Sequence, residues 1–135
     1  MIKTETQIER DFMTFIKGSK LGDALKGRVY RAGMRPDDAD TEDLIVKFLT
    51  GLDTQIQVGI VILNLYVPDI NSKAAGKKVQ DFKRIGVLQE LINDFLLNAG
   101  GSEYWLESEN TPRTMLNEEI KQHCITVKIK FKRLT

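Results

Sequence analysis

The sequence predicts an α+β domain: an antiparallel sheet of about four to five strands with two main helices packed on one face. Residues 55–69 alternate like a long strand, and both faces of this strand are apolar through its middle. Residues 77–98 place apolar side chains along one broad helical stripe. Several further strand-like segments follow one another through turns, which favours pairing between consecutive strands.

The N-terminal segment is predicted to form an amphipathic helix over residues 6–17. Its apolar residues recur at helical spacing: Ile8, Phe12, Phe15 and Ile16. Thr4 or Thr6 is expected to cap the start, and Gly18 is expected to end the helix. One more short turn is predicted within residues 19–26.

The next part of the chain is predicted to contain a strand, an exposed connection and a hairpin. Residues 28–33 read as a short strand, and residues 34–43 hold five acids and a proline with nothing to bury. Residues 44–50 form the next strand pattern. A turn at residues 51–53 then predicts an antiparallel hairpin with the long strand over residues 55–68, which a proline ends.

The second helix is the clearest on the chain. Residues 69–78 are predicted to form a basic loop of small residues before it. Its apolar stripe consists of Val79, Phe82, Leu88, Leu91, Ile92, Phe95 and Leu96. The glycines within residues 98–101 are expected to stop it.

The C-terminal part is predicted to add strands. Residues 102–109 form a strand pattern that contains the only tryptophan, and we favour an extended segment over a short helix for residues 113–122. Residues 123–134 alternate strictly, with apolar residues on one side and Lys128, Lys130 and Lys132 on the other. These lysines favour a soluble sheet that resists edge-to-edge aggregation over a phosphate-binding surface.

Composition indicates one domain over residues 1–135, with 41% hydrophobic and 29% charged residues. A net charge of +1 argues against a dedicated nucleic-acid binder and against sequence-specific nucleic-acid recognition. The single cysteine excludes an intrachain disulfide and fits a reducing cytosol. The first residues lack the apolar stretch of a signal peptide, and no apolar run has the length of a membrane span, so no membrane partner is expected.

No catalytic, cofactor-binding or metal-binding constellation is visible in the sequence, so we predict no enzyme, no cofactor and no metal site. His123 and Cys124 are neighbours on a predicted strand, where they point to opposite faces and are poorly placed to form a dyad. The acids in residues 34–43 lack the calcium-loop pattern. The glycine and lysines of residues 71–78 lack the phosphate-loop pattern.

The order of elements resembles the bacteriophage tail terminator and tail-completion proteins, small α+β proteins that form a ring at the end of the tail tube. The segments that carry this resemblance are IERDFMTFI, VYRAGMRPDDADTED, IQVGIVILNLYVPD, VQDFKRIGVLQELINDFL, EYWLE and ITVKIKFKRL. They span most of the chain. The resemblance lies in order and pattern and includes no diagnostic motif.

The resemblance implies a structural phage or prophage tail protein that assembles with itself into a ring, with a hexamer expected. Its partners would be tail-tube and head-connector proteins, in the host cytoplasm during assembly and then in the virion tail. Loops 34–43 and 69–78 are the candidate contacts, through Arg35, Asp37, Asp38, Asp40, Glu42, Asp43, Lys73, Lys77 and Lys78. The alternatives are a head-closure or neck protein and a small non-enzymatic α+β ligand-binding domain.

Overall fold

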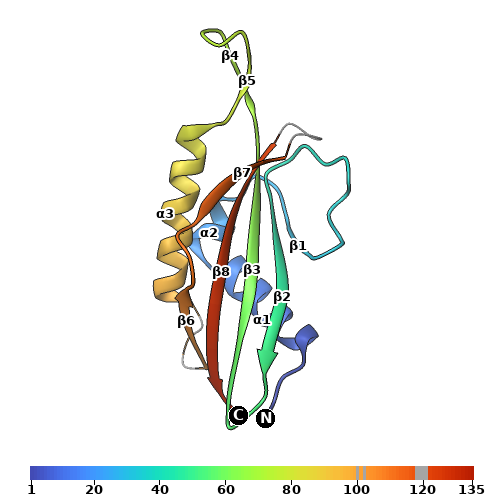
Figure 1. The fold of residues 1–135 in the computed structure, drawn as a ribbon, viewed down its shortest axis with the longest axis vertical. Coiled ribbons are helices and arrows are strands. Elements are labelled where there is room, and N and C mark those ends of the chain that lie inside the picture. Colours follow the sequence, from blue (N-terminus) through green and yellow to red (C-terminus); the bar gives the residue numbers. More distant parts are fainter. Residues whose placement is uncertain (100, 102, 118–121) are drawn as a thin grey trace.

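The structure is a computed structural model that describes residues 1–99, 101, 103–117 and 122–135 (Figure 1). The helices of this described part are α1 (Glu5–Lys17), α2 (Lys20–Ala24) and α3 (Phe82–Asn98). The strands are β1 (Val29–Arg31), β2 (Asp43–Leu52), β3 (Ile56–Pro68), β4 (Ile70–Ser72), β5 (Lys77–Val79), β6 (Tyr104–Ser108), β7 (Arg113–Asn117) and β8 (Gln122–Leu134). The mixed α and β content that the sequence predicts is therefore present.

The main sheet of the described residues has six strands in the order β1-β2-β3-β8-β6, with β7 also paired to β8. The sheet is larger than the four to five strands predicted, and β4 and β5 form a second, two-stranded sheet. The expectation of a wholly antiparallel sheet is also wrong, because β1 pairs with β2 in parallel. The long acidic connection explains this, since it carries the chain back to the starting end of β1, as parallel neighbours require.

The two long strands β3 and β8 lie side by side at the centre of the sheet and pair along their whole length. From residue 57 to 67 of β3, odd-numbered residues are buried and even-numbered residues are only partly buried. The buried core comprises Ile8, Phe12, Ile16, Leu21, Leu44, Val46, Val61, Leu63, Leu65, Val67, Ile85, Leu88, Ile92, Phe95, Tyr104, Ile125, Val127, Ile129 and Phe131. The core thus combines one side of the central strands with side chains from all three described helices.

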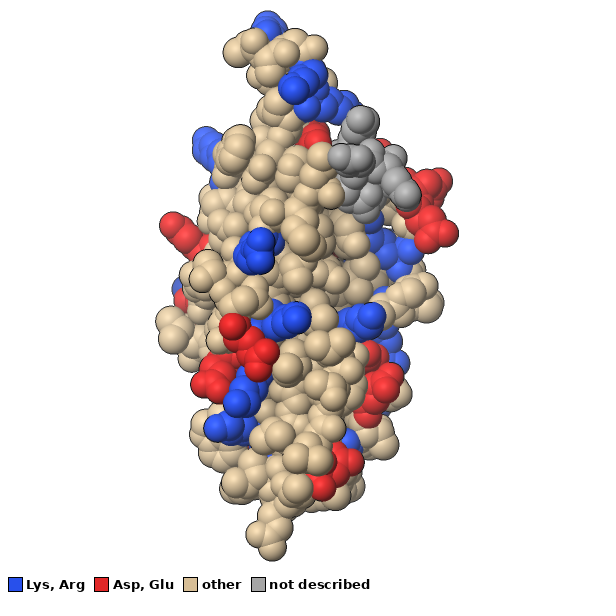
Figure 2. Space-filling model, in the orientation of Figure 1, with Lys and Arg blue, Asp and Glu red and all other residues tan. Residues whose placement is uncertain are grey.

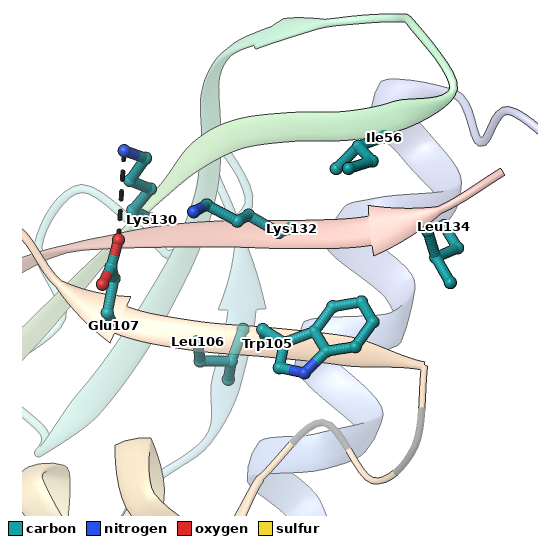
Figure 3. Close-up of a pocket in the computed structure, with 7 residues that line it drawn as sticks. All are labelled: Ile56, Trp105, Leu106, Glu107, Lys130, Lys132 and Leu134. Atoms are coloured by element: carbon teal, nitrogen blue, oxygen red, sulfur yellow. Dashed lines mark ion pairs between the residues drawn. The ribbon is translucent and has the colours of Figure 1, made fainter.

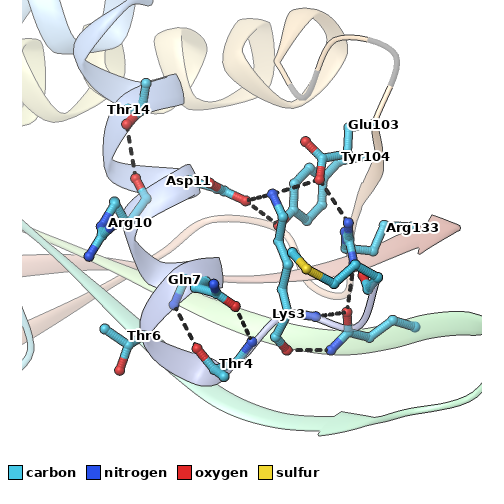
Figure 4. A network of polar contacts seen from close by, with 12 residues as sticks. Lys3, Thr4, Thr6, Gln7, Arg10, Asp11, Thr14, Glu103, Tyr104 and Arg133 are labelled. Atoms are coloured by element: carbon cyan, nitrogen blue, oxygen red, sulfur yellow. Dashed lines mark hydrogen bonds and ion pairs between the residues drawn. The ribbon is translucent and has the colours of Figure 1, made fainter. Parts of the chain in front are cut away.

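Helix α1 begins and ends where the sequence predicts, within one residue. Thr4 caps it: its hydroxyl accepts a hydrogen bond from the Gln7 backbone N–H at 3.3 Å, and the Gln7 side chain accepts one from the Thr4 N–H at 2.8 Å. This reciprocal pair satisfies two backbone donors that a helix start leaves free (Figure 4). Gly18 is the C-cap.

The predicted loop over residues 69–78 is instead largely a hairpin, formed by β4 and β5, that projects beyond the main sheet (Figure 1). Gly76 adopts a φ of 67° in its turn, a conformation that favours glycine. The buried stripe of the helix also starts later than the sequence predicts. Val79 belongs to β5, and Phe82 is 73% exposed, so the buried stripe of α3 starts at Ile85. Val79 belongs to the hairpin because its strand pairing with Ile70 of β4 takes precedence over helical periodicity.

The remaining predicted strands are present. β6 lies within predicted residues 102–109, and β7 confirms an extended conformation for residues 113–117. Residues 118–121 of that predicted segment lie outside the described residues. β8 has the predicted alternation, with residues 125, 127, 129 and 131 buried and the lysine positions facing the other way.

Candidate interaction surface

One face of the main sheet carries the even-numbered side chains of β3 and is only partly covered by the described chain. Strand register places cationic side chains beside the apolar ones. Ile62 lies between Lys47 of β2 and Lys128 of β8, and neighbouring β3 positions oppose Lys130 and Lys132. We call this surface the open sheet face: Val58, Ile60 and Ile62 of β3, Lys47 of β2, Lys128, Lys130 and Lys132 of β8, and Trp105 of β6.

A shallow pocket of about 310 Å³ lies at one end of the open sheet face (Figure 3). Trp105 is 55% exposed and pairs in register with Lys132. Ile56 and Leu134 complete its apolar side, and both are also exposed. Large apolar side chains that gather in one exposed patch are typical of a surface that contacts another macromolecule.

The lysines of this face lie apart from one another, with uncharged side chains between them. In the orientation of Figure 1, in which α1 passes behind β3, the surface is mostly uncharged and its Lys and Arg side chains form separate groups (Figure 2). Among the described residues, the one ion pair on the open sheet face joins Lys130 and Glu107 at 3.9 Å. The other lysines of the face have no ion-pair partner among the described residues, so they can pair with acids of an external partner.

Arg35, a predicted contact residue, is held inside its own chain. Its guanidinium donates from Nε to Asp43 Oδ2 at 3.1 Å and from Nη2 to Gln122 Oε1 at 3.0 Å. It also lies over the Tyr66 ring, 4.3 Å from the centroid, in a cation–π arrangement. With only 6% of its side chain exposed, Arg35 anchors residues 34–43, which we call the acidic loop, to β2, β3 and β8.

Glu42 and Asp43, also predicted contacts, are buried at the start of β2. Glu42 accepts bonds from Arg84 Nε at 2.7 Å and Nη2 at 2.9 Å, which joins the loop to α3. Asp43 accepts one from the Arg28 N–H at 2.8 Å. Burial by itself raises the pKa of both carboxyls, but these hydrogen bonds and the nearby arginines outweigh it and hold each pKa below its ordinary value.

The other predicted contact residues are exposed. Within the described part of the chain, no ion pair involves the acids of the loop (Asp37, Asp38 and Asp40) or the lysines of the β4–β5 hairpin (Lys73, Lys77 and Lys78). The structure does not bring these two groups together with each other. The predicted set is thus divided into three anchoring residues and six residues that are open to a partner.

His123 and Cys124 have separate partners. The His123 ring nitrogen Nδ1 lies 2.6 Å from Asp69 Oδ1, whereas the Cys124 sulfur lies 3.7 Å from the Thr126 hydroxyl. Burial raises the pKa of the Cys124 thiol, which disfavours the reactive thiolate. Among the described residues, no group of three or more His, Cys, Asp and Glu side chains could hold a metal, and no helix could span a membrane.

Sequence reasoning missed a polar network that joins the N-terminus to the sheet (Figure 4). Lys3 bonds Asp11 at 2.5 Å and Glu103 at 2.6 Å, and Glu103 also accepts from Arg133 at 2.9 Å. The hydroxyl of the buried Tyr104 donates to Asp11 at 2.7 Å. No local pattern signals this network, because its members are far apart in the sequence.

The sequence matches no protein-family model, and no curated protein sequence matches it significantly.

Proposed function

We propose that this chain is a structural protein of a phage or prophage tail, which forms a homo-oligomeric ring, expected to be a hexamer, that ends the tail tube and joins it to the head connector. The single observation that carries the proposal is the open sheet face, an apolar surface with lysines that the described chain leaves partly exposed. We further propose that the helices cover only the opposite face, so that a neighbouring subunit supplies the missing cover.

A ring requires that each subunit offer two different surfaces that fit one another and close on themselves. The open sheet face and the acidic loop are two such surfaces at different places on the domain. A net charge of +1 leaves little overall repulsion between copies. The proposed ring therefore has a chemically reasonable lateral contact.

The β4–β5 hairpin is proposed to contact the next layer of the tail, either the tube or the head connector. It projects beyond the main sheet and carries Lys73, Lys77 and Lys78 at exposed positions (Figure 1). A projecting cationic element can reach a protein stacked above the ring without disturbing lateral contacts. In this role the protein needs no catalytic residue, and we place it in the host cytoplasm during assembly and then in the virion tail.

The test is negative-stain electron microscopy of the purified protein, alone and with polymerising tail-tube protein. Rings that cap tube ends and limit tube length are expected. Binding to a portal complex without any effect on tubes would instead favour a head-closure or neck protein. A monomer that neither caps tubes nor binds a portal would contradict the proposal and favour a ligand-binding domain.

A charge-reversal variant tests the proposed contact of the β4–β5 hairpin with the next layer of the tail. Reversing Lys77 and Lys78 to Glu should leave rings intact and abolish capping, because only the contact between layers is changed. Reversing Lys17 and Lys83 to Glu, at exposed positions on helices, makes the same change in net charge and serves as the matched control. Equal capping by both variants would remove the hairpin from the proposed contact.

A further inference from the structure

We infer that the acidic loop of one copy docks on the open sheet face of the next copy. The loop contributes the exposed Asp37, Asp38 and Asp40. The open sheet face contributes Lys128 and Lys132 together with its apolar side chains. The inference rests on the proposed function, from which it takes the assembly of identical copies, and it names the surfaces that meet.

Charge complementarity within one sequence identifies a second copy as the occupant. In the described part of the chain, Lys128 and Lys132 have no ion-pair partner, and neither do the three loop acids. The single ion pair on the face is long, at 3.9 Å between Lys130 and Glu107. Unpaired cations on one surface and unpaired acids on another are a self-complementary arrangement, provided that two copies meet head to tail.

Both the open sheet face and the β4–β5 hairpin carry lysines that could pair with the acidic loop. Exposed apolar side chains make the open sheet face the better docking site. Exposed ion pairs by themselves contribute little to association. The pocket at the end of the open sheet face adds Ile56, Trp105 and Leu134, which are 47%, 55% and 62% exposed (Figure 3). The loop offers Met34, 67% exposed, three residues before the first acid. Removing these apolar side chains from water supplies a driving force for docking. The β4–β5 hairpin offers less, because Ile70, 45% exposed, is the one large apolar side chain that it exposes among the described residues.

The loop is also held in place before any partner arrives. Arg35 fastens it through Asp43, Gln122 and the Tyr66 ring, which fixes the backbone directly before the exposed acids. A preorganised loop loses less conformational entropy when it binds. The buried residues of the loop therefore hold its exposed acids in position for binding.

The first experiment uses charge reversal in the full chain. One variant carries Asp37→Lys with Asp38→Lys, a second carries Lys128→Glu with Lys132→Glu, and a third combines all four changes. Self-association is measured by sedimentation velocity over a concentration series. Each two-site variant should associate at least about tenfold more weakly than the wild type, because like charges then face each other. The four-site variant should recover association, since it restores opposite charges and the wild-type net charge.

Trp105 provides an independent readout because it is the only tryptophan. Docking of the loop excludes water from its pocket, so its fluorescence should shift to the blue as wild-type concentration rises. The shift should weaken in high salt, which screens exposed charges. A control variant with Lys20→Glu and Lys83→Glu makes the same charge change on helices and should behave like the wild type.

Three outcomes would overturn the inference: a wild type that stays monomeric over the whole series, two-site variants that associate like the wild type, or a four-site variant that fails to recover. A failure of the proposed function is measured separately, as the absence of tube capping. Tube capping by a two-site variant that still forms rings would overturn only the docking inference. Recovery by the four-site variant without any tube capping would support the docking contact and overturn only the tail assignment.

Discussion

The two sides of β3 are both largely apolar but have different environments. Leu63 on the core side is fully buried, at 0% exposure, whereas its neighbour Ile62 on the open sheet face is only partly buried. Both are large aliphatic residues on one strand, so residue type does not explain the difference. The difference shows that apolar patterning identifies surfaces that need covering but does not say whether the same chain covers them.

The largest expected effect separates these two sides directly. Leu63→Ala should lower the free energy of unfolding by about 3 kcal/mol, because it removes a fully buried side chain and leaves a cavity. Ile62→Ala should lower the free energy of unfolding of the monomer by only about 1 kcal/mol, because the Ile62 side chain is only partly buried and its truncation removes less buried apolar surface. Urea unfolding of dilute protein measures both. Equal losses would mean that the open sheet face is covered within the monomer.

The second prediction concerns the two kinds of acid in the loop region. Glu42→Gln should lower the free energy of unfolding by about 2 kcal/mol, because it weakens the charged hydrogen bonds to Arg84. Asp38→Asn, at an exposed position, should change it by less than about 0.5 kcal/mol. Thermal unfolding of the two variants provides the measurement. A large loss from Asp38→Asn would assign the exposed acid a structural role within the monomer.

The third prediction tests close packing on the core side of β3. A Cβ at Gly59 would lie 2.6 Å from the Phe131 ring and from the Thr50 carbonyl oxygen, so Gly59→Ala should destabilise by about 1–2 kcal/mol. Gly86 in α3 has no neighbouring atom in the way, and Gly86→Ala should stabilise by about 0.5–1 kcal/mol through helix propensity. Chemical denaturation should give opposite signs; the same sign for both would contradict this packing.

The smallest expected effect is on the acid side of the stability profile. The pKa values of Glu42 and Asp43 lie below their ordinary 4.5 and 3.8, so the stability they contribute is present above these values and is lost as pH falls through the lowered ones. Glu42→Gln should therefore flatten the fall in stability below about pH 4.5. Urea midpoints measured between pH 3 and 7 test this, and an unchanged slope in the variant would exclude Glu42 as a source.

Elements whose identity depends on local periodicity could be predicted from the amino-acid sequence alone. The capped helix α1, the long strand β3 and the alternation of β8 follow from spacing that a short window reveals, and so does the doubly apolar character of β3. The candidate surfaces could be predicted only in part: the exposed acids follow from local charge, but the lysines of β8 acquire meaning only beside Ile62 and Trp105.

Which polar residues turn inward and how the strands pair depend on contacts between segments that are far apart in the sequence. Arg35 looks like one more charge in an exposed loop, yet its partner Gln122 lies 87 residues away. The parallel pairing of β1 with β2 and the hairpin over β4 and β5 likewise depend on where neighbouring strands lie. The physical reason is the same in each case. A hydrogen bond or ion pair forms only where the fold holds its two partners close together. The sequence around one partner does not show which distant residue will lie beside it.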